Sequence, residues 1–533
     1  MKTTGKGHGF LKQAGILAIA GIIVRIIGIL YRSPLTSIIG DEGNGYYSTA
    51  YNIYTIILLV SSYSIPSAIS KEIAQLLTLK EYKNAHRFFR CTVIYVAVVG
   101  GIASILTFLF GGVLMSNSNS IIVLRTFVPT IFLSGLLGVL RGYFQAHGSM
   151  VQTSVSQILE QLFNALISIM AAYLFVQMTI SESETTQAIY GAVGSAIGTG
   201  VGVLIALIFM YAVYLLNKKQ IIKKVNRDRK HKVLRNNTMF KRITLTITPF
   251  VLSTFIYNLS TSLNQEIYSR ILIYIKGFTV KEVTIQYGIF SGKAVVITSI
   301  PIAIASAVSS ALIPSIAGSY VKGDTEATNE KIDNAIHMLM LIAIPAAVGL
   351  AVHAQAIVQL LFPQADSLLL AAKLLRLLSI TVIFYSLSTL TNAVLQGIGK
   401  PIIPVINAFV ALVFQSIILV GLLLGTSLNL YALVIVTIIY SSLMCLLNSI
   451  AIKRQLNYKS KIMMNFGLPA LASVIMGIVS LAAYKLCYMI IKSNVVALFF
   501  AILIALLTYG ITLILLKVVK KEILRDFFRH NTK

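Results

Sequence analysis

Residues 15–40 read GILAIAGIIVRIIGILYRSPLTSIIG, and their character governs how the rest of the chain is interpreted. The run is long enough to cross a bilayer, because a transmembrane helix needs about 20 mostly apolar residues. It nevertheless carries Arg25 and Arg32, seven residues apart, which places them on nearly one helix face, about 10 Å apart along the axis. An ionisable side chain inside a span is costly and by default faces a protein interior or a wet cavity. We therefore expect this face to line a path for an anionic ligand.

The composition points to an all-α polytopic membrane protein. The chain has 533 residues, of which 57% are hydrophobic and 11% charged, whereas soluble domains are about 25% charged. The formal net charge of +27 fits two interpretations: basic patches that bind nucleic acid, or Lys and Arg concentrated in cytoplasmic loops. In so apolar a chain we favour the second, and expect membrane lipids rather than nucleic acid as partners.

The hydropathy pattern predicts fourteen membrane spans. They cover residues 12–39, 46–78, 84–114, 121–146, 152–177, 187–216, 242–274, 284–317, 331–352, 366–397, 401–424, 428–454, 460–490 and 494–518. Clusters of Gly, Asn, Ser and Asp between them predict turns, at residues 41–45, 116–120 and 322–324.

Charge indicates the orientation of these spans. With the N-terminus inside, Lys and Arg gather in the inside segments at nearly every loop, which supports an even number of spans and two cytoplasmic termini. The densest basic run, residues 217–242, has eleven Lys and Arg. We interpret it as a solvated linker, with contact to anionic lipid headgroups as the alternative. Tyr46, Tyr47, Tyr51 and Tyr54 predict an interfacial tyrosine belt.

An internal repeat predicts two lobes. Arg125 and Arg376 are 251 residues apart, and the same interval separates residues 144–148 from residues 395–399. The repeat is six spans long, so both copies should have the same orientation, as in parallel-repeat transporters. The predicted parts are listed here: an N-lobe at 1–216, a basic cytoplasmic linker at 217–241, a C-lobe at 242–454, and two further spans with a basic tail at 455–533.

Basic side chains inside spans are the candidate binding residues. They are Arg25, Arg32, Arg270 and Lys293. Arginine suits bidentate binding of phosphate, although side chains near a helix end also reach the interface by snorkelling. No nucleotide, metalloprotease, redox or hydrolase motif occurs in the sequence. We therefore expect neither enzyme activity nor a bound cofactor.

Two further polar residues predict an ion site or an ion pair. Glu266 lies four residues before Arg270, so the two side chains can pair on one helix face. The alternative is a Na⁺ or H⁺ coupling site made by Glu266 and Asn264. Glu160, near the inner end of its span, is interpreted as an interfacial structural carboxylate.

Several short motifs resemble those of a transporter family. They are the segments at residues 25–28, 39–47, 65–71, 287–289, 313–316, 344–350 and 395–401. In order and spacing they resemble the stage V sporulation protein B and lipid II flippase branch of the multidrug/oligosaccharidyl-lipid/polysaccharide exporter superfamily. The resemblance covers residues from about 10 to 520.

The resemblance implies two six-helix lobes in a V, MATE-like, with two extra C-terminal helices. It implies a lipid-linked cell-wall or polysaccharide precursor, of undecaprenyl-pyrophosphate type, moved across the plasma membrane by alternating access. Coupling to Na⁺, H⁺ or the membrane potential is expected, and we expect a monomer. Two alternatives stay open: a cation-coupled multidrug exporter of the same superfamily, and a non-transporting membrane scaffold that recruits cell-wall synthesis proteins.

Overall fold

The structure is a computed structural model. It describes residues 20–518 except 22, 29, 59–64, 229–233 and 322, and leaves out the side chains at 67–68, 114, 227, 245–258, 307–308, 310–315, 317 and 321. The start of the predicted span 12–39 and the predicted tail beyond residue 518 therefore lie outside the described residues.

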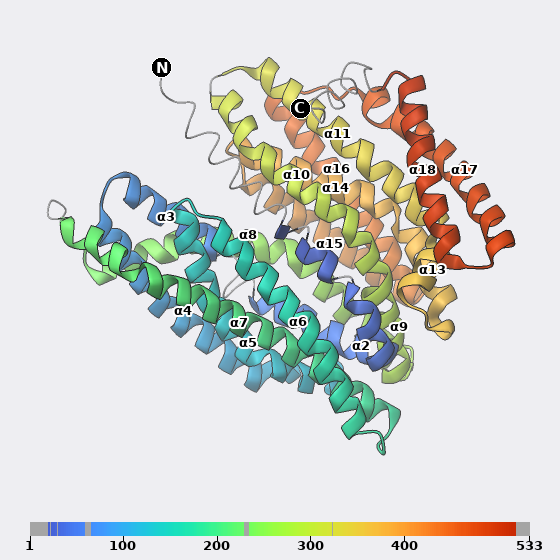
Figure 1. Ribbon diagram of the computed structural model, residues 1–533, viewed down its shortest axis with the longest axis horizontal. Coiled ribbons are helices and arrows are strands. Elements are labelled where there is room, and N and C mark those ends of the chain that lie inside the picture. The colour runs from blue at the N-terminus through green and yellow to red at the C-terminus, as the bar shows by residue number, and fades with distance from the viewer. Residues whose placement is uncertain are drawn as a thin grey trace. The chain divides into compact units, whose positions relative to one another are not determined.

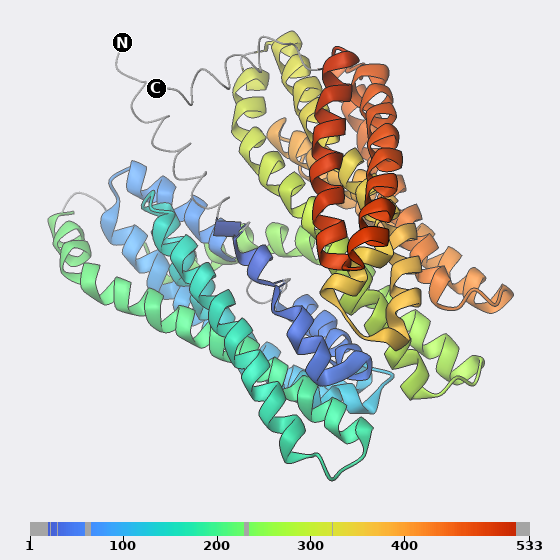
Figure 2. The ribbon, with the colours of Figure 1, turned by 45° about the vertical axis from the view of Figure 1, so that its right-hand side comes forward.

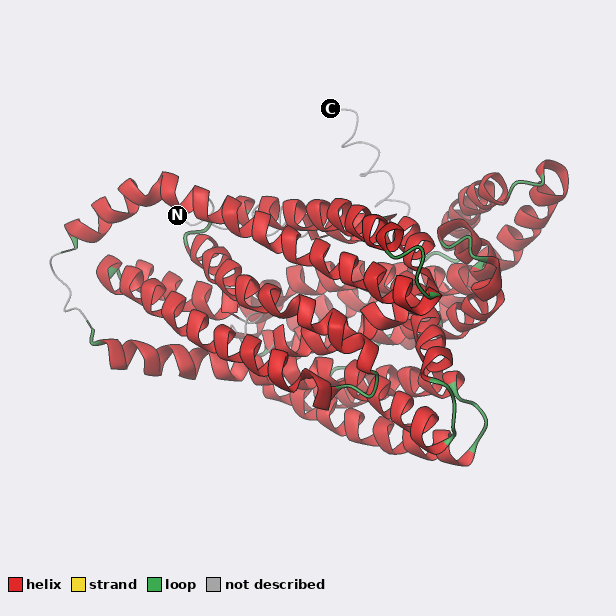
Figure 3. Cartoon of the chain, turned by 90° about the horizontal axis from the view of Figure 1, so that it is seen from below, coloured by secondary structure: helices red, strands yellow, loops and turns green. Residues whose placement is uncertain are grey.

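Every regular element in the described part of the chain is a helix (Figures 1 and 3). In the first part of the chain, up to Ile289, these are α2 (Arg32–Leu58), α3 (Ile65–Thr78), α4 (Tyr82–Phe110), η2 (Gly111–Leu114), α5 (Ser118–Ala146), α6 (Val151–Met178), α7 (Glu184–Arg227), α8 (Asn236–Arg270), η3 (Ile271–Ile275) and α9 (Val280–Ile289). They are followed by η4 (Phe290–Val295), α10 (Val296–Val321), α11 (Thr325–Val352), α12 (Ala354–Leu361), α13 (Ala365–Leu378), α14 (Ile380–Gly397), α15 (Ile402–Gly425), α16 (Leu430–Leu456), η5 (Met463–Gly467), α17 (Leu468–Ile491) and α18 (Asn494–Leu515).

The prediction of a helical, multi-span membrane protein is confirmed. Among the described residues, 10 helices are long and apolar enough to cross a membrane, or up to 11 if α13 and α14, bent by 43°, form one span. Each of them overlaps a predicted span. The other three predicted spans, 12–39, 46–78 and 242–274, include positions whose backbone or side chains lie outside the described set.

The chain divides into two compact units, unit 1 at residues 1–288 and unit 2 at residues 289–533. Helix α8 belongs to unit 1, since the Asn52 side chain donates a hydrogen bond to Gln265 Oε1 over 2.8 Å. The unit boundary therefore differs from the predicted linker at 217–241. That segment is largely helical, because α7 continues to Arg227 and α8 begins at Asn236. The assignment of spans to symmetric lobes stays a prediction.

Close packing of α6 on α7 organises unit 1, and the two helices run side by side in Figures 1 and 2. Gly194, Gly198 and Gly202 form a stripe on α7 that faces α6. A Cβ atom at Gly198 would lie 2.2 Å from Ser168 Oγ, and one at Gly202 would lie 2.4 Å from the Glu160 carbonyl oxygen. Small residues at this spacing let two helix backbones approach closely within a membrane.

The predicted turn at residues 41–45 is wrong, because only Gly40 leaves the helix. Its φ of 69° and ψ of −178° belong to a region that glycine alone adopts readily. Glu42 and Asn44, which follow Gly40, are helical and buried, and their side chains have polar partners within unit 1. The Asn44 side chain donates to Thr36 Oγ1 over 2.8 Å, for example. The predicted breaks near 116–120 and 322–324 do separate helices.

Unit 2 has its main hydrophobic core between α10, α11, α14 and α16, with Leu339, Met340, Leu390 and Ile452 at its centre. Helices α17 and α18 pack as an antiparallel pair, red in Figure 1. Helix boundaries repeat at the interval seen in the sequence, since α5 and α14 end 251 residues apart, and α6 and α15 begin 251 residues apart.

Candidate functional site

A polar cavity of about 480 Å³ lies inside unit 1, and we call it the tyrosine cavity. Helices α2, α5, α6 and α7 supply most of its wall. Its polar and charged lining is listed here: Tyr31, Arg32, Tyr47, Tyr51, Tyr54, Ser134, Arg141, Gln145, Thr153, Gln157, Glu160, Gln161, Asn164 and Thr199. The cavity thus combines two guanidinium groups and one carboxylate with hydroxyl and amide groups.

Arg32, the first residue of α2, is one of the two cations of the tyrosine cavity. It is partly buried and forms no ion pair with any acid that the structure describes. Its electrostatic partners are tyrosines, namely Tyr31, Tyr47 and Tyr51. A cation compensated only by neutral hydroxyl groups favours an incoming anion, because bringing that anion in restores the charge balance. The predicted anion-facing position of Arg32 is therefore consistent with the geometry.

The tyrosines on α2 form a packed wall, so their prediction as an interfacial belt is wrong. Tyr47 and Tyr54 are 3% exposed. Tyr47 stacks on Tyr51 at a centroid distance of 5.6 Å, and Tyr54 stacks on Phe127 at 4.6 Å. The Tyr47 hydroxyl lies 3.2 Å from Thr199 Oγ1 on α7. These rings hold a rigid, hydroxyl-bearing surface against Arg32.

Sequence reasoning missed the ion pair between Arg141 on α5 and Glu160 on α6. Arg141 Nη2 donates to Glu160 Oε2 over 2.6 Å, and Arg141 Nε donates to Ser156 Oγ over 2.9 Å. The side chains are 14% and 30% exposed, and both line the tyrosine cavity. Glu160 is therefore a cavity residue rather than an interfacial one. The available signal was opposite charge in two neighbouring predicted spans, Arg141 near the end of one and Glu160 in the first half of the next.

The other predicted basic residues lie elsewhere. Arg25 is exposed and does not line the tyrosine cavity. Arg270, whose side chain is 54% exposed, donates through Nε to Glu266 Oε1 over 2.8 Å and also does not line it. Lys293 belongs to unit 2, where it is 1% exposed, donates to Ser367 Oγ over 2.6 Å and lies 5.9 Å from the centre of the Phe362 ring.

The two residues predicted for ion coupling are close in sequence and differ in environment. Glu266 pairs with Arg270 at the i,i+4 spacing, which matches the first of the two interpretations, an intrahelical ion pair. Asn264 is 8% exposed. Among the described residues, no group of three or more His, Cys, Asp or Glu could hold a metal ion.

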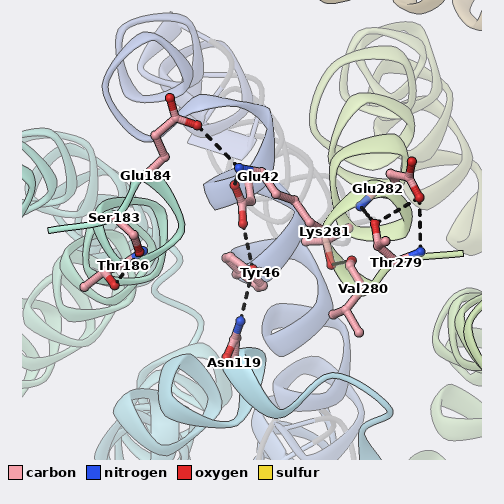
Figure 4. Close-up of polar contacts among 11 residues, drawn as sticks. Glu42, Tyr46, Asn119, Ser183, Glu184, Thr186, Thr279, Val280, Lys281 and Glu282 are labelled. Atoms are coloured by element: carbon pink, nitrogen blue, oxygen red, sulfur yellow. Dashed lines mark hydrogen bonds and ion pairs between the residues drawn. The ribbon is translucent and has the colours of Figure 1, made fainter.

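A second charged group, the Glu42 cluster, joins four helices of unit 1 (Figure 4). Lys281 Nζ on α9 lies 3.4 Å from Glu42 Oε2 on α2 and 3.4 Å from Glu184 Oε2 on α7. Glu42 Oε1 accepts from the Tyr46 hydroxyl over 2.8 Å, and Tyr46 accepts from the Asn119 side chain over 3.2 Å. The cluster ties the start of α9 to α2, α5 and α7.

Comparison with known proteins identifies relatives along the whole chain. Stage V sporulation protein B of Bacillus subtilis (strain 168) is 23% identical over 523 residues, which are 97% of this chain and 97% of that protein. Lipid II flippase MurJ of the same organism is 23% identical over 492 residues, 88% of this chain and 87% of MurJ.

Solved structures show the same fold. A lipid II flippase MurJ in an inward closed conformation aligns with a TM-score of 0.66 at 16% identity, covering 94% of this chain and 99% of that one. An inward-facing multidrug resistance MATE family transporter of the MOP superfamily aligns with a TM-score of 0.63 at 15% identity, covering 83% and 98%.

Two family models match the sequence. The MatE model matches residues 292–420. The polysaccharide biosynthesis protein model matches residues 10–319, which are more than half of the 533 residues. The chain therefore belongs to the polysaccharide biosynthesis protein family.

Proposed function

We propose that this protein is a flippase that moves a lipid-linked saccharide, of the undecaprenyl-pyrophosphate type, across the cell membrane by alternating access. The product would be a precursor of the cell wall or of a polysaccharide. The name of one relative, lipid II flippase MurJ, supports this class of substrate, because the chain covers 87% of that protein. The apolar helices support a location in the membrane.

The observation that carries the proposal is the environment of Arg32. The tyrosine cavity holds a guanidinium that no described carboxylate neutralises, next to a second guanidinium, that of Arg141, already paired with Glu160. A pyrophosphate would accept charge-assisted hydrogen bonds from Arg32, and the tyrosine hydroxyls would donate to its remaining oxygens. The neutral Gln and Thr groups of the lining suit the hydroxyls of a sugar.

The finer architecture belongs to the same proposal. It consists of fourteen transmembrane helices, two pseudo-symmetric six-helix lobes in a V, and two additional C-terminal helices. Arg25, Arg270 and Lys293 would meet the anion at other stages of the transport cycle. Na⁺, H⁺ or the membrane potential would drive the cycle, with Glu266 and Asn264 as the candidate coupling residues. Both termini would be cytoplasmic, and the working form would be a monomer.

A lipid-translocation assay in liposomes tests the proposal. Purified protein should move a fluorescent undecaprenyl-pyrophosphate saccharide between leaflets, and Arg32→Gln should lower the rate at least tenfold because it removes the unpaired cation. Arg25→Glu should also abolish translocation while the protein still inserts into the membrane. Arg125→Gln is the matched control, since Arg125 is exposed and lies over the Phe108 ring. Full activity of Arg32→Gln would contradict the tyrosine cavity as the anion site, and full activity of Arg25→Glu would remove Arg25 from the transport path.

Multidrug export is the second candidate. It is favoured by the match of residues 292–420 to the MatE model and by the MATE-like fold. A cationic drug requires an acid in its binding site, and the only described carboxylate that lines the tyrosine cavity, that of Glu160, is already paired. Efflux of a cationic dye from the same liposomes, with no movement of the prenyl saccharide, would favour this candidate.

A further inference from the structure

A second polar pocket, of about 240 Å³, lies where α4 begins and where α5 and α7 end. We call it the headgroup pocket. Its ionisable lining includes His86 on α4, His147 after α5 and Lys224 on α7. No acid lines it. Among the described residues, His86 Nδ1 is buried without a hydrogen-bond partner. The pocket therefore offers nitrogen donors and positive charge.

An apolar groove of about 570 Å³, the acyl groove, lies further along the same three helices. It is lined by α4 residues 89–94, α5 residues 136–140 and α7 residues 207–214. Arg90 is the one charged residue of this lining. Ile94 and Ile208 are 56% and 59% exposed, so the groove opens on a surface where, in a membrane protein, hydrocarbon chains lie.

The headgroup pocket and the acyl groove meet at a layer of aromatic rings. Phe89 lies 4.5 Å from Tyr143 and 5.4 Å from Tyr214 between ring centres, and Tyr143 lies 4.5 Å from His147. Arg90 interacts electrostatically with both His86 and Tyr214. The two sites therefore adjoin across this ring layer, and we call them together the track. From one end to the other its surface changes from cationic to aromatic to apolar, the order that a phospholipid presents from its phosphate to its chains.

Two acids at the start of α4 and the end of α7 accept hydrogen bonds from neutral groups. Glu81 Oε2 accepts from the Asn84 side chain over 2.8 Å, and Asp228 Oδ2 accepts from the Lys83 backbone N–H over 3.1 Å. Among the described residues, neither Lys224 nor Arg90 forms an ion pair, so both cations can pair with an anionic ligand. The track shares no lining residue with the tyrosine cavity, so the two sites can be altered independently by mutation.

We propose that this track binds an anionic phospholipid of the surrounding membrane. The phosphate lies in the headgroup pocket near Lys224, His86 and His147, Arg90 reaches it from the other side, and one acyl chain fills the groove between α4, α5 and α7. The bound lipid bridges three helices of unit 1 and stabilises their packing. This inference does not depend on which lipid the protein transports.

Native mass spectrometry of the delipidated full-length protein tests the proposal. We expect phosphatidylglycerol to bind at least tenfold more tightly than phosphatidylcholine. Lys224→Gln should weaken phosphatidylglycerol about fivefold, since a basic side chain near an anionic headgroup is worth that factor. Lys223→Gln, on the same helix but outside the pocket lining, is the matched control. Ile208→Trp, which fills the acyl groove from an exposed position, should weaken the lipid, whereas Leu204→Trp, outside the groove lining, should not.

Several outcomes would overturn the assignment. Equal binding of the two phospholipids would contradict recognition of an anionic headgroup by the headgroup pocket. Unchanged lipid binding by Ile208→Trp would contradict the placement of an acyl chain in the acyl groove. Glycerol phosphate that competes as well as the whole lipid would make this a site for free phosphate compounds. Undecaprenyl phosphate that displaces phosphatidylglycerol from wild type but not from Lys224→Gln would assign the track to the transported lipid. The wild-type lipid comparison stands even if a variant fails to fold.

Discussion

Arg141 and Glu160 show how strongly two single residues of the tyrosine cavity depend on each other. The pair is only 14% and 30% exposed, and the Arg141 Nε is also held by Ser156. Removing one partner of a buried ion pair leaves the other charge poorly compensated, at a cost of roughly 3–5 kcal/mol for a fully buried pair and less for one that lines a polar cavity. Replacing both removes that penalty.

We therefore predict that Arg141→Ala and Glu160→Ala each destabilise the protein more than the double variant does. Thermal unfolding in detergent, followed by loss of the monomeric peak in size-exclusion chromatography, measures this as a double-mutant cycle. Additive effects in the cycle would mean that the pair does not contribute to stability.

His147 predicts a pH dependence. Burial lowers the pKa of His147 below its ordinary value of 6.5, and Lys224 lowers it further, against the hydrogen bond with the Tyr143 carbonyl, which raises it. As the pH falls through 6.5, His147 becomes protonated in the unfolded chain but stays neutral in the folded one. The free energy of unfolding therefore decreases until the pH passes below the lowered pKa of His147 in the folded state.

The measurement is the melting temperature of delipidated protein at pH 8 and at pH 5.5. We expect wild type to lose more on acidification than His147→Gln, which cannot take up the proton. His86 lies in the same pocket and titrates too, so the difference between the two proteins is the informative quantity. An equal loss in both proteins would assign the acid sensitivity to other groups.

At the level of helices, the glycine stripe on α7 predicts the most sensitive contact of unit 1. A Cβ at position 198 would lie 2.3 Å from the Ser168 backbone nitrogen, which cannot move without displacing α6. We predict that Gly198→Ala destabilises the protein by roughly 1–3 kcal/mol through overpacking and lowers the yield of folded protein. Gly421→Ala on α15 is the control, because nothing lies within 4 Å of the added atom. Its effect should be neutral or stabilising.

Helix positions were predictable from the sequence where the chain is continuously apolar. The predicted span 401–424 is α15 (Ile402–Gly425), and the predicted span 152–177 is α6 (Val151–Met178). The prediction of a turn at residues 41–45 was wrong because polar side chains there bind residues on distant helices, as Glu42 does with Lys281. Local sequence cannot distinguish such a partnered polar residue from a solvated turn.

The site was predictable in part. Arg32 stood out because a charge within a long apolar run needs an interior partner. The tyrosines of α2 and the Arg141–Glu160 pair were not recognised as its companions, since their meeting depends on how α2, α5 and α6 pack. Spacing along one helix indicates which residues share a face, but not which face meets a cavity.

At the level of the whole molecule, the distribution of charge predicts which ends of the helices face the cytoplasm. In a variant with Cys91, Cys445 and Cys487 replaced by Ser, we predict that a cysteine at Glu182 reacts with a membrane-impermeant maleimide on intact cells. A cysteine at Lys223 should react only after permeabilisation. Both positions are exposed, so access to the side chain does not limit labelling. The opposite pattern would invert the topology and place the termini outside.

Gly40, the residue of α2 with non-helical dihedral angles, is the point at which this helix can bend. Arg32 is eight residues before it, about 12 Å along the helix at 1.5 Å per residue. A rotation of about 20° at this one glycine, comparable to a modest helix kink, would move the Arg32 backbone by about 4 Å. That displacement exceeds the length of a hydrogen bond, so a small change in one pair of dihedral angles would separate the guanidinium from a bound phosphate.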